Sequence, residues 1–316
     1  MGRIYGATIV VIGGVMALGI SAFVHWPTPP AAEVAPAWGQ ALSGINDAQA
    51  YLLPLAESNI FPARKAGSAD AITGARAAYI FDVATLRPLF VKNEDMRVPI
   101  ASLTKIMSAV VVLERLHAQD VVTVTAESIR VDGTKRDLSA GDRFTVGDLM
   151  RFMLVQSSND AAAALSVYAR ERGIDFIKEM NDTAARIGMT HTIFKDPAGL
   201  DDTAHATARD LGFLIRYALR YEHQIFEPLR EKTFVLETVD ETRAITVTNT
   251  NQLLDTLEGI RGGKTGYTDG ARGCMILLVQ VPETRDTIAA VVLGSEDRFT
   301  HTAELVTWAR TAFQWQ

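Results

Sequence analysis

The chain of 316 residues contains one cysteine, Cys274, so it cannot form an internal disulfide. Basic residues are also scarce, with 31 Lys and Arg against 37 Asp and Glu and a formal net charge of −6. Nucleic-acid partners are therefore not expected, because phosphate backbones are bound by clustered Lys and Arg. The sequence has neither a His-Glu-x-x-His motif nor a His/Cys cluster with ligand spacing, so we expect no metal and no cofactor.

Charged residues are missing altogether from residues 4–24, which follow Arg3. At a rise of about 1.5 Å per residue, a helix of this length spans a hydrocarbon core of about 30 Å. The next basic residue is Arg64, and this asymmetry predicts that the bulk of the chain lies outside the cytoplasm. We therefore interpret residues 1–26 as a transmembrane anchor or a signal peptide, because small residues near Ala31 leave cleavage open.

The rest of the chain divides into a Pro/Ala-rich spacer, residues 27–71, and a globular part, residues 72–316. A short helix over 47–53 is expected in the spacer, and a chain beginning near Ile72 should stay soluble and active. The globular part alternates between strand and helix patterns. Strands are predicted over 77–83, 88–91, 234–238, 244–248, 275–281 and 287–293, and helices over 102–117, 145–186 as a largely helical stretch, 210–221 and 300–313. This order predicts an α+β fold in which early and late strands share one antiparallel sheet around a helical insertion.

A Ser-x-x-Lys motif stands at the start of the first of these helices. Ser102 and Lys105 are one turn apart, so their side chains can meet. A hydroxyl becomes a good nucleophile only when a base takes its proton, and a lysine can be that base if burial or a second cation lowers its pKa. The helix N-terminus adds N–H groups that stabilise developing negative charge. Taken alone, the motif is more typical of a serine N-cap beside a surface lysine than of an active site.

Two further motifs follow in the chain. Ser157-Ser158-Asn159 is a Ser-x-Asn that opens a helix, and by itself it is typical of a cap or turn. Lys264-Thr265-Gly266 is a glycine-flanked Lys-Thr that opens a strand, where the cation and the hydroxyl suit a substrate carboxylate. It is not a phosphate-binding loop, because Glu258 stands where that motif requires glycine. Three unrelated caps or turns that happen to fall in this order are a less plausible explanation than one active site.

The motif set is the one found in penicillin-binding proteins and class A β-lactamases. Over about residues 77–315, the chain resembles the serine D-alanyl-D-alanine carboxypeptidases of the low-molecular-mass penicillin-binding proteins. The likeness extends to residues 99–107, 158–161, 196–200, 205–211 and 249–251. It implies the fold shared by β-lactamases and penicillin-binding-protein transpeptidases: α+β, with an antiparallel sheet flanked by helices and a helical subdomain.

The resemblance also implies an activity and a location. A member of this family removes the terminal D-alanine from peptidoglycan stem peptides through an acyl-serine intermediate, and β-lactam antibiotics inhibit it. We therefore expect peptidoglycan stem peptides as substrates and a position on the periplasmic face. The protein would be anchored in the inner membrane through its N-terminal segment or be secreted.

The resemblance assigns the following roles to the first two motifs. Ser102 is the acylated nucleophile and Lys105 its general base. Ser157 relays a proton to the leaving amine. Asn159 holds the substrate amide and helps to orient Lys105.

The third motif is expected to bind substrate. Lys264 and Thr265 hold the terminal carboxylate, Gly266 belongs to the same strand, and Lys264 lowers the pKa of Lys105 by like charge. The N–H groups of Ser102 and Tyr267 form the oxyanion hole. Arg298 is a further candidate for carboxylate recognition, although a surface arginine is equally consistent with its position.

Several alternatives follow from the same residues. A D,D-endopeptidase that cleaves peptidoglycan cross-links fits nearly as well, because the chain ends at the helix after its last strand. A class A-like β-lactamase is disfavoured, because no Glu-x-x-Leu-Asn lies between Asn159 and Lys264. A non-catalytic β-lactam-sensing module is disfavoured because the serine and both lysines are present. Arg272 departs from the glycine that the family often has there and adds charge at the rim of the site.

Overall fold

The computed structural model describes residues 61–130 and 138–315. The predicted membrane segment, residues 1–26, and the short helix expected over 47–53 lie outside these residues. Within the described ranges, no helix is both long enough and apolar enough to cross a membrane.

The predicted strands and helices are present in the predicted order, and the described chain adds β1, β4, β5, α7 and β11, which the sequence did not predict. The strands are β1 (Ala63–Arg64), β2 (Ala77–Asp82), β3 (Pro88–Lys92), β4 (Val121–Thr123), β5 (Arg143–Thr145), β6 (Thr233–Glu237), β7 (Ala244–Thr248), β8 (Ile260–Thr268), β9 (Arg272–Gln280), β10 (Thr287–Ser295) and β11 (Phe313–Gln314). The helices are α2 (Thr104–Arg115), α3 (Val146–Val155), α4 (Asn159–Arg170), α5 (Phe176–Arg186), α6 (Ala208–Ala218), α7 (Glu222–Ile225) and α8 (Arg298–Ala312), with 3₁₀ turns η1 (Ala101–Leu103), η2 (Leu219–Tyr221), η3 (Pro228–Arg230) and η4 (Gln252–Asp255).

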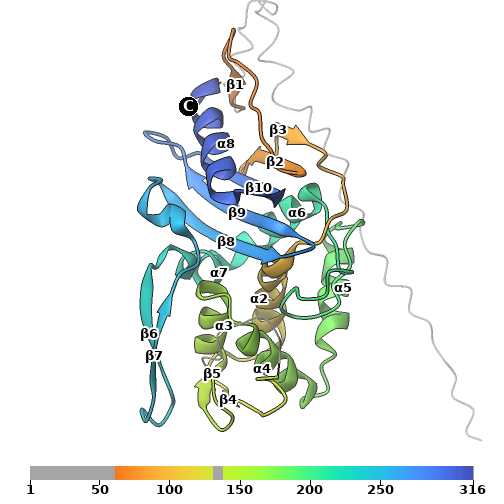
Figure 1. Ribbon diagram of the computed structural model, residues 1–316, viewed down its shortest axis with the longest axis vertical. Helices are drawn as coiled ribbons and strands as arrows, with labels where there is room; N and C mark the ends of the chain where they lie inside the picture. Colours follow the sequence, from red (N-terminus) through yellow and green to blue (C-terminus); the bar gives the residue numbers. More distant parts are fainter. Residues whose placement is uncertain (1–60, 131–137, 316) are drawn as a thin grey trace, which may run out of the picture. The chain divides into compact units, whose positions relative to one another are not determined.

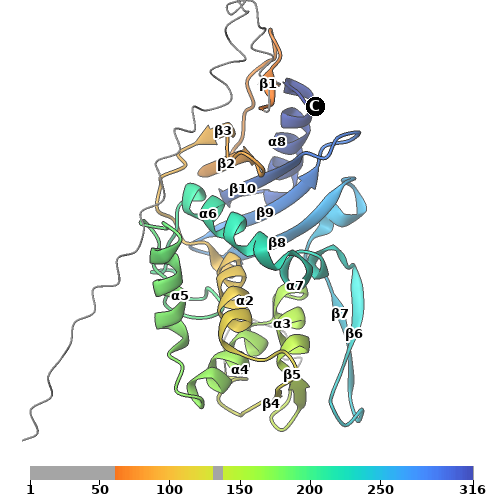
Figure 2. The ribbon, with the colours of Figure 1, turned by 180° about the vertical axis from the view of Figure 1, so that it is seen from behind.

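A five-stranded antiparallel sheet joins the early and late strands in the order β3-β2-β10-β9-β8. Its central strands are buried almost throughout, because α8 packs on one face and α6 on the other (Figures 1 and 2). Continuous apolar runs in β9 and β10 are the expected pattern for strands covered on both faces. The predicted sheet is confirmed, and β8 forms the edge that meets the helical part.

The helical part is built around α2, which packs against α3, α4, α5 and α6 (Figure 2). Three helices begin at hydroxyl caps: the side chains of Thr145, Ser158 and Thr207 each accept a backbone N–H of the first turn. The largely helical stretch predicted over 145–186 is three separate helices, because the caps at Ser158 and Asp175 and the turns before them interrupt it.

Two local expectations need adjustment. Lys264-Thr265-Gly266 was expected to open a strand, but it lies in the middle of β8, which begins at Ile260. The helix predicted from Ser102 begins as the 3₁₀ turn η1 and becomes α-helical only at Thr104. The start of β8 was missed because the glycines at 262 and 263 are rare in strands, so the sequence pattern there does not indicate one.

The last residues of the predicted spacer contact the end of the chain. β1 pairs with β11 in antiparallel register, and Trp308 Nε1 donates to the backbone oxygen of Ala69 over 2.8 Å. The domain boundary near Ile72 remains a prediction, but residues 63–69 have partners in and beyond α8.

Candidate active site

Ser102 lies in the turn η1, which leads directly into α2. The preceding Ala101 has a φ of 48°, a left-handed conformation that is strained for a residue with a Cβ. Strand β8 passes close by, since a Cβ added to Gly266 would lie 3.0 Å from the backbone nitrogen of Ser102. Glycine at 266 therefore allows the strand to run against the backbone of the expected nucleophile.

Lys105 is fully buried and donates three hydrogen bonds. Its Nζ lies 2.8 Å from Ser102 Oγ, 2.7 Å from Asn159 Oδ1 and 2.8 Å from the backbone oxygen of Ala198. Burial lowers the pKa of Lys105 from 10.5 to about 7, and the carboxylate of Asp196 opposes that shift. A lysine with such a pKa is neutral often enough near pH 7 to accept the proton of the hydroxyl that it contacts.

The Ser-x-Asn motif uses its two serines differently. Ser158 is the N-cap of α4, and its Oγ accepts the N–H of Ala161 over 3.2 Å. Ser157 has a φ of 63°, and its Oγ accepts a 2.8 Å hydrogen bond from Lys264 Nζ. The capping interpretation of this motif therefore holds for Ser158, and the active-site role of Ser157 remains a prediction that its contact with Lys264 supports.

Lys264 is the second buried lysine of the site. Besides Ser157, its Nζ contacts the backbone oxygen of Thr265 over 2.8 Å. The pKa of Lys264 is held well below 10.5, first by burial and then by the positive charges of Lys105 and Arg298. A bound carboxylate would oppose all three causes and favour the charged form. The Oγ1 of Thr265 lies 2.6 Å from that of Thr250. The sequence predicted no role for Thr250.

Arg298 is the first residue of α8, and the structure brings it to the same strands. A Cβ added to Gly273 would lie 3.1 Å from the Cβ of Arg298, and Gly273 is paired with Tyr267 of β8. Burial lowers the pKa of Arg298, and its Nε is buried without a hydrogen-bond partner among the described residues. The surface-arginine interpretation is therefore weaker than the proposed contact with a substrate anion.

Tyr267 occupies the outer end of β8. Its side chain is 55% exposed, unlike the buried lysine and threonine that precede it in the strand. Its phenol donates weakly to Asp269 over 3.4 Å. Only its backbone N–H was expected to act in the site, and that role remains a prediction.

The loop of residues 196–201, for which the sequence predicted no role, holds Lys105 in place. The carboxylate of Asp196 accepts the backbone N–H groups of the next residues, from Ala198 to Asp201. Gly199 has a φ of 80°, and a Cβ there would lie 1.9 Å from the backbone oxygen of Ala101. The loop therefore reaches the catalytic turn at its glycine and supplies the carbonyl of Ala198 to Lys105. Asp-Pro-Ala-Gly is a turn signature, so the turn could have been predicted, although its partner could not.

In the part of the chain that the structure describes, no group of three or more His, Cys, Asp or Glu could hold a metal ion. Cys274 lies buried in β9, and burial raises the pKa of its thiol to about 11. That thiol stays protonated at neutral pH, so Cys274 is a packing residue of the strand and not a reactive thiol.

A serine bonded to a buried lysine, next to a second lysine on the edge strand of this α+β fold, defines a class of serine acyl-transfer enzymes with the penicillin-binding fold. The sequence profile of the peptidase S11 family, D-alanyl-D-alanine carboxypeptidase, matches residues 64–297. The chain belongs to this family.

Curated relatives cover both activities considered from the sequence. The chain is 28% identical over 227 residues to D-alanyl-D-alanine carboxypeptidase DacF of Bacillus subtilis, a match that covers 70% of this chain and 57% of that protein. It is 31% identical over 232 residues to a D-alanyl-D-alanine endopeptidase of Pseudomonas aeruginosa, covering 72% of this chain and 74% of that protein. Among solved structures, the Streptomyces K15 DD-transpeptidase superposes with a TM-score of 0.70 at 27% identity, covering 76% of this chain and 98% of that one.

Proposed function

We propose that the protein is a serine-type D-alanyl-D-alanine carboxypeptidase that removes the terminal D-alanine from peptidoglycan stem peptides and is acylated by penicillin. The observation that carries the proposal is the burial of Lys105 against Ser102 Oγ, with a pKa of about 7. Burying a lysine is energetically costly, and a lysine that serves only the fold has no need of a contact with Ser102 Oγ. The buried contact therefore favours a catalytic role for the pair.

In the acylation step, neutral Lys105 takes the proton of Ser102 while Oγ attacks the carbonyl of the penultimate D-alanine. The N–H groups of Ser102 and Tyr267 receive the developing oxyanion. The bond between the carbonyl carbon and the amide nitrogen then breaks, and the proton passes through Ser157 to the departing amine. Support for this relay is the 2.8 Å contact that holds Ser157 against Lys264.

In the deacylation step, water attacks the acyl-enzyme, the bond from Oγ to the carbonyl carbon breaks, and the proton returns to Ser102. Lys105 again serves as the base, because the same nitrogen faces that oxygen. Asn159 supports both steps, since its Oδ1 fixes the position of Lys105 over 2.7 Å.

Recognition of the substrate rests on its free carboxylate. Lys264, Thr265 and Arg298 provide two cations and a hydroxyl near the edge of β8, and Arg298 Nε is buried without a partner among the described residues. A β-lactam also carries a carboxylate beside its reactive carbonyl, so the same groups would position it for attack by Ser102.

The second candidate function is a D,D-endopeptidase that cleaves peptidoglycan cross-links. It is favoured by the likeness to the Pseudomonas aeruginosa endopeptidase, of which the chain spans 74%. The residue released from a cross-link also keeps a free carboxylate, so Lys264 and Arg298 suit both substrates equally. Either activity requires a location outside the cytoplasm, and we propose the periplasmic face with attachment through residues 4–24.

The experiment that tests this proposal combines labelling with product analysis. Labelled penicillin should acylate Ser102, and Ser102→Ala should abolish the label while circular dichroism remains unchanged. Mass analysis of purified muropeptides should show loss of one D-alanine from pentapeptide stems, with cross-linked dimers left intact. Cleavage of dimers alone would favour the endopeptidase, and labelling of Ser102→Ala would refute the nucleophile assignment.

A further inference from the structure

A pocket of about 460 Å³ lies between the end of α5, the helix α6 and the turn that joins β2 to β3. None of the active-site residues described above lines it. Its apolar lining comes from Leu86, Ile187 and Phe213, which are half-buried against the main core. The volume is within the range of small-molecule sites, so the pocket has room for a ligand of modest size.

The polar lining of the pocket is entirely cationic apart from one phenol. Arg186, Arg216 and Arg220 line it together with Tyr217, and no Asp or Glu does. This concentration is unusual in a chain whose formal net charge is −6. Arg216 lies in α6, and Arg220 lies four residues further on in the 3₁₀ turn η2 that follows it. Across the described ranges, neither of them lies within salt-bridge distance of a carboxylate.

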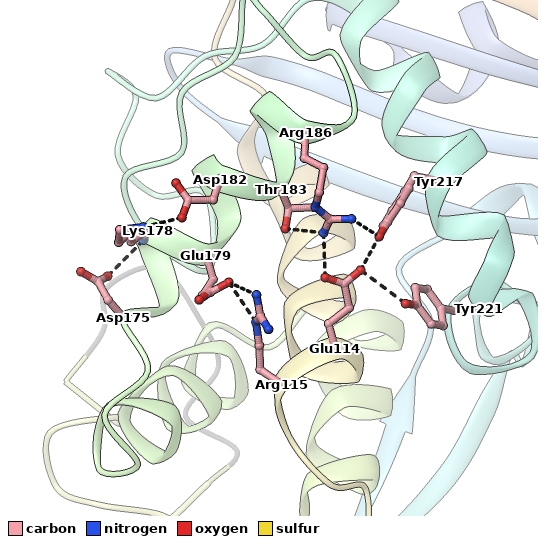
Figure 3. Close-up of polar contacts among 10 residues, drawn as sticks. All are labelled: Glu114, Arg115, Asp175, Lys178, Glu179, Asp182, Thr183, Arg186, Tyr217 and Tyr221. Atoms are coloured by element: carbon pink, nitrogen blue, oxygen red, sulfur yellow. Dashed lines mark hydrogen bonds and ion pairs between the residues drawn. The ribbon is translucent and has the colours of Figure 1, made fainter. Parts of the chain in front are cut away.

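A hydrogen-bonded network holds the third arginine at the edge of the pocket (Figure 3). Arg186 donates to Glu114 over 2.9 Å, to Thr183 over 3.1 Å and to the phenol of Tyr217, which itself bonds to Glu114. Glu114 is mostly buried and neutralises one positive charge. The guanidinium of Arg220 lies 5.0 Å from the ring centre of Tyr217, so the same ring positions a second arginine. Two uncompensated cations therefore remain beside the apolar lining.

We propose that this pocket binds an anionic amphiphile through its phosphate, as a phospholipid with a negatively charged headgroup presents it. The phosphate would lie between Arg216 and Arg220, and the first carbons of the lipid tail would cover Leu86, Ile187 and Phe213. Guanidinium groups bind phosphate oxygens in bidentate geometry, and Arg216 and Arg220 line the same pocket, so both could contact one phosphate. A small inorganic anion would leave the apolar lining unused, so the pairing of the two surfaces favours an amphiphile. This site does not depend on the proposed peptidase activity.

Native mass spectrometry of the full-length protein in a non-ionic detergent can test the proposal. The probes are dihexanoylphosphatidylglycerol, dihexanoylphosphatidylcholine and glycerophosphoglycerol, which is the anionic headgroup without tails. We expect the anionic lipid to bind more tightly than either other probe. The double variant Arg216→Gln/Arg220→Gln should weaken that binding about tenfold or more, because it removes charge-assisted hydrogen bonds to the phosphate.

The matched control is Arg130→Gln/Arg285→Gln, which removes the same charge from two exposed arginines that do not line the pocket. It should bind the anionic lipid as the unaltered protein does, and both double variants should keep their rate of penicillin labelling. Equal lipid binding by the two double variants would overturn the proposal. So would equal affinity for glycerophosphoglycerol and the lipid, because the apolar lining would then contribute nothing.

Discussion

Lys105 and Lys264 are buried cations that share one site, and among the described residues neither is hydrogen-bonded to a carboxylate. Burial lowers the pKa of both lysines, and the charge of Lys105 lowers that of Lys264 further. The like-charge effect of Lys264 on Lys105 that the sequence predicted is not found, because burial alone lowers the pKa of Lys105 and Asp196 opposes it. The fold tolerates this arrangement because backbone and side-chain oxygens accept hydrogen bonds from both lysine Nζ atoms. The consequence for chemistry is a base that works near neutral pH.

The first prediction concerns the pH dependence of acylation. The pKa of Lys105 is lowered to about 7, and only the neutral amine can accept the proton of Ser102. The rate constant for acylation by labelled penicillin should therefore rise about tenfold per pH unit well below pH 7 and level off above it. Stopped-flow or quenched labelling from pH 5 to 9 measures the profile. A rate that stayed constant or fell over this range would contradict the role of Lys105 as the base.

The second prediction concerns Asp196, which we regard as a positioning residue. Its carboxylate raises the pKa of Lys105 against the effect of burial, so Asp196→Asn should move the midpoint of the same profile to lower pH. The maximal rate should also fall, because an amide nitrogen cannot accept the N–H groups of Leu200 and Asp201. The control is Asp201→Asn, a neighbouring exposed carboxylate that bonds to Thr203 and should leave the midpoint unchanged. An unmoved midpoint in Asp196→Asn would limit that residue to a structural role.

At the scale of elements, the site is formed where a loop, a helix start and an edge strand meet at glycines. Gly266 lets β8 run past Ser102, and Gly199 lets the loop after Asp196 approach Ala101. At Gly199 an added Cβ would overlap the backbone of Ala101, and at Gly266 it would be in tight contact with the nitrogen of Ser102. The catalytic geometry therefore depends on residues that carry no chemistry of their own.

The third prediction tests one of these approaches. Gly199→Ala should cost about 1–3 kcal/mol through its backbone and a similar amount through the clash with Ala101. It should also slow acylation, because the displaced loop carries the carbonyl of Ala198 that holds Lys105. Gly188→Ala is the matched control, since Gly188 has a φ of 90° but nothing within 4 Å of an added Cβ.

Denaturant unfolding and penicillin labelling should be measured for both alanine variants. Gly188→Ala should lose only the stability due to its backbone and keep the full labelling rate. Equal effects of the two substitutions on labelling would mean that the contact at Gly199 does not position the base.

On the scale of the whole molecule, segments from opposite ends of the described chain stabilise one another. β1 pairs with β11, the guanidinium of Arg64 lies 5.6 Å from the ring centre of Trp308, and Ala69 accepts the indole N–H. These contacts lie on the far end of α8 from Arg298, the residue nearest the site. They should therefore affect stability more than chemistry.

The fourth prediction compares chains that begin at residue 57 and at residue 72. The shorter chain lacks β1 and the four hydrogen bonds that Lys65, Ser68 and Ala69 make with α8, so its free energy of unfolding should be about 2–6 kcal/mol lower. Both chains should react with penicillin at the same rate, because all of the proposed site residues are retained. Denaturation curves and labelling rates check the two statements. Loss of labelling in the shorter chain would mean that the segment supports the active site.

Local sequence patterns predicted most of the central sheet, the larger helices and the chemical groups of the proposed site. Period-2 and period-3.6 apolar patterns predicted most strands and helices, and the three motifs selected Ser102, Lys105 and Lys264. These signals are local, because they depend on neighbouring side chains, caps and turns. Their order along the chain was enough to indicate the family.

The coupling between these groups depends on the tertiary fold. Burial of Lys105, the carbonyl of Ala198 that holds it, and the approach of Arg298 to β8 all depend on segments distant in sequence. A pKa is determined by solvent exclusion and by charges in space, neither of which a short motif contains. The pocket at Arg216 could not be predicted from the sequence for the same reason, because its lining residues come from separate segments that only the folded chain brings together.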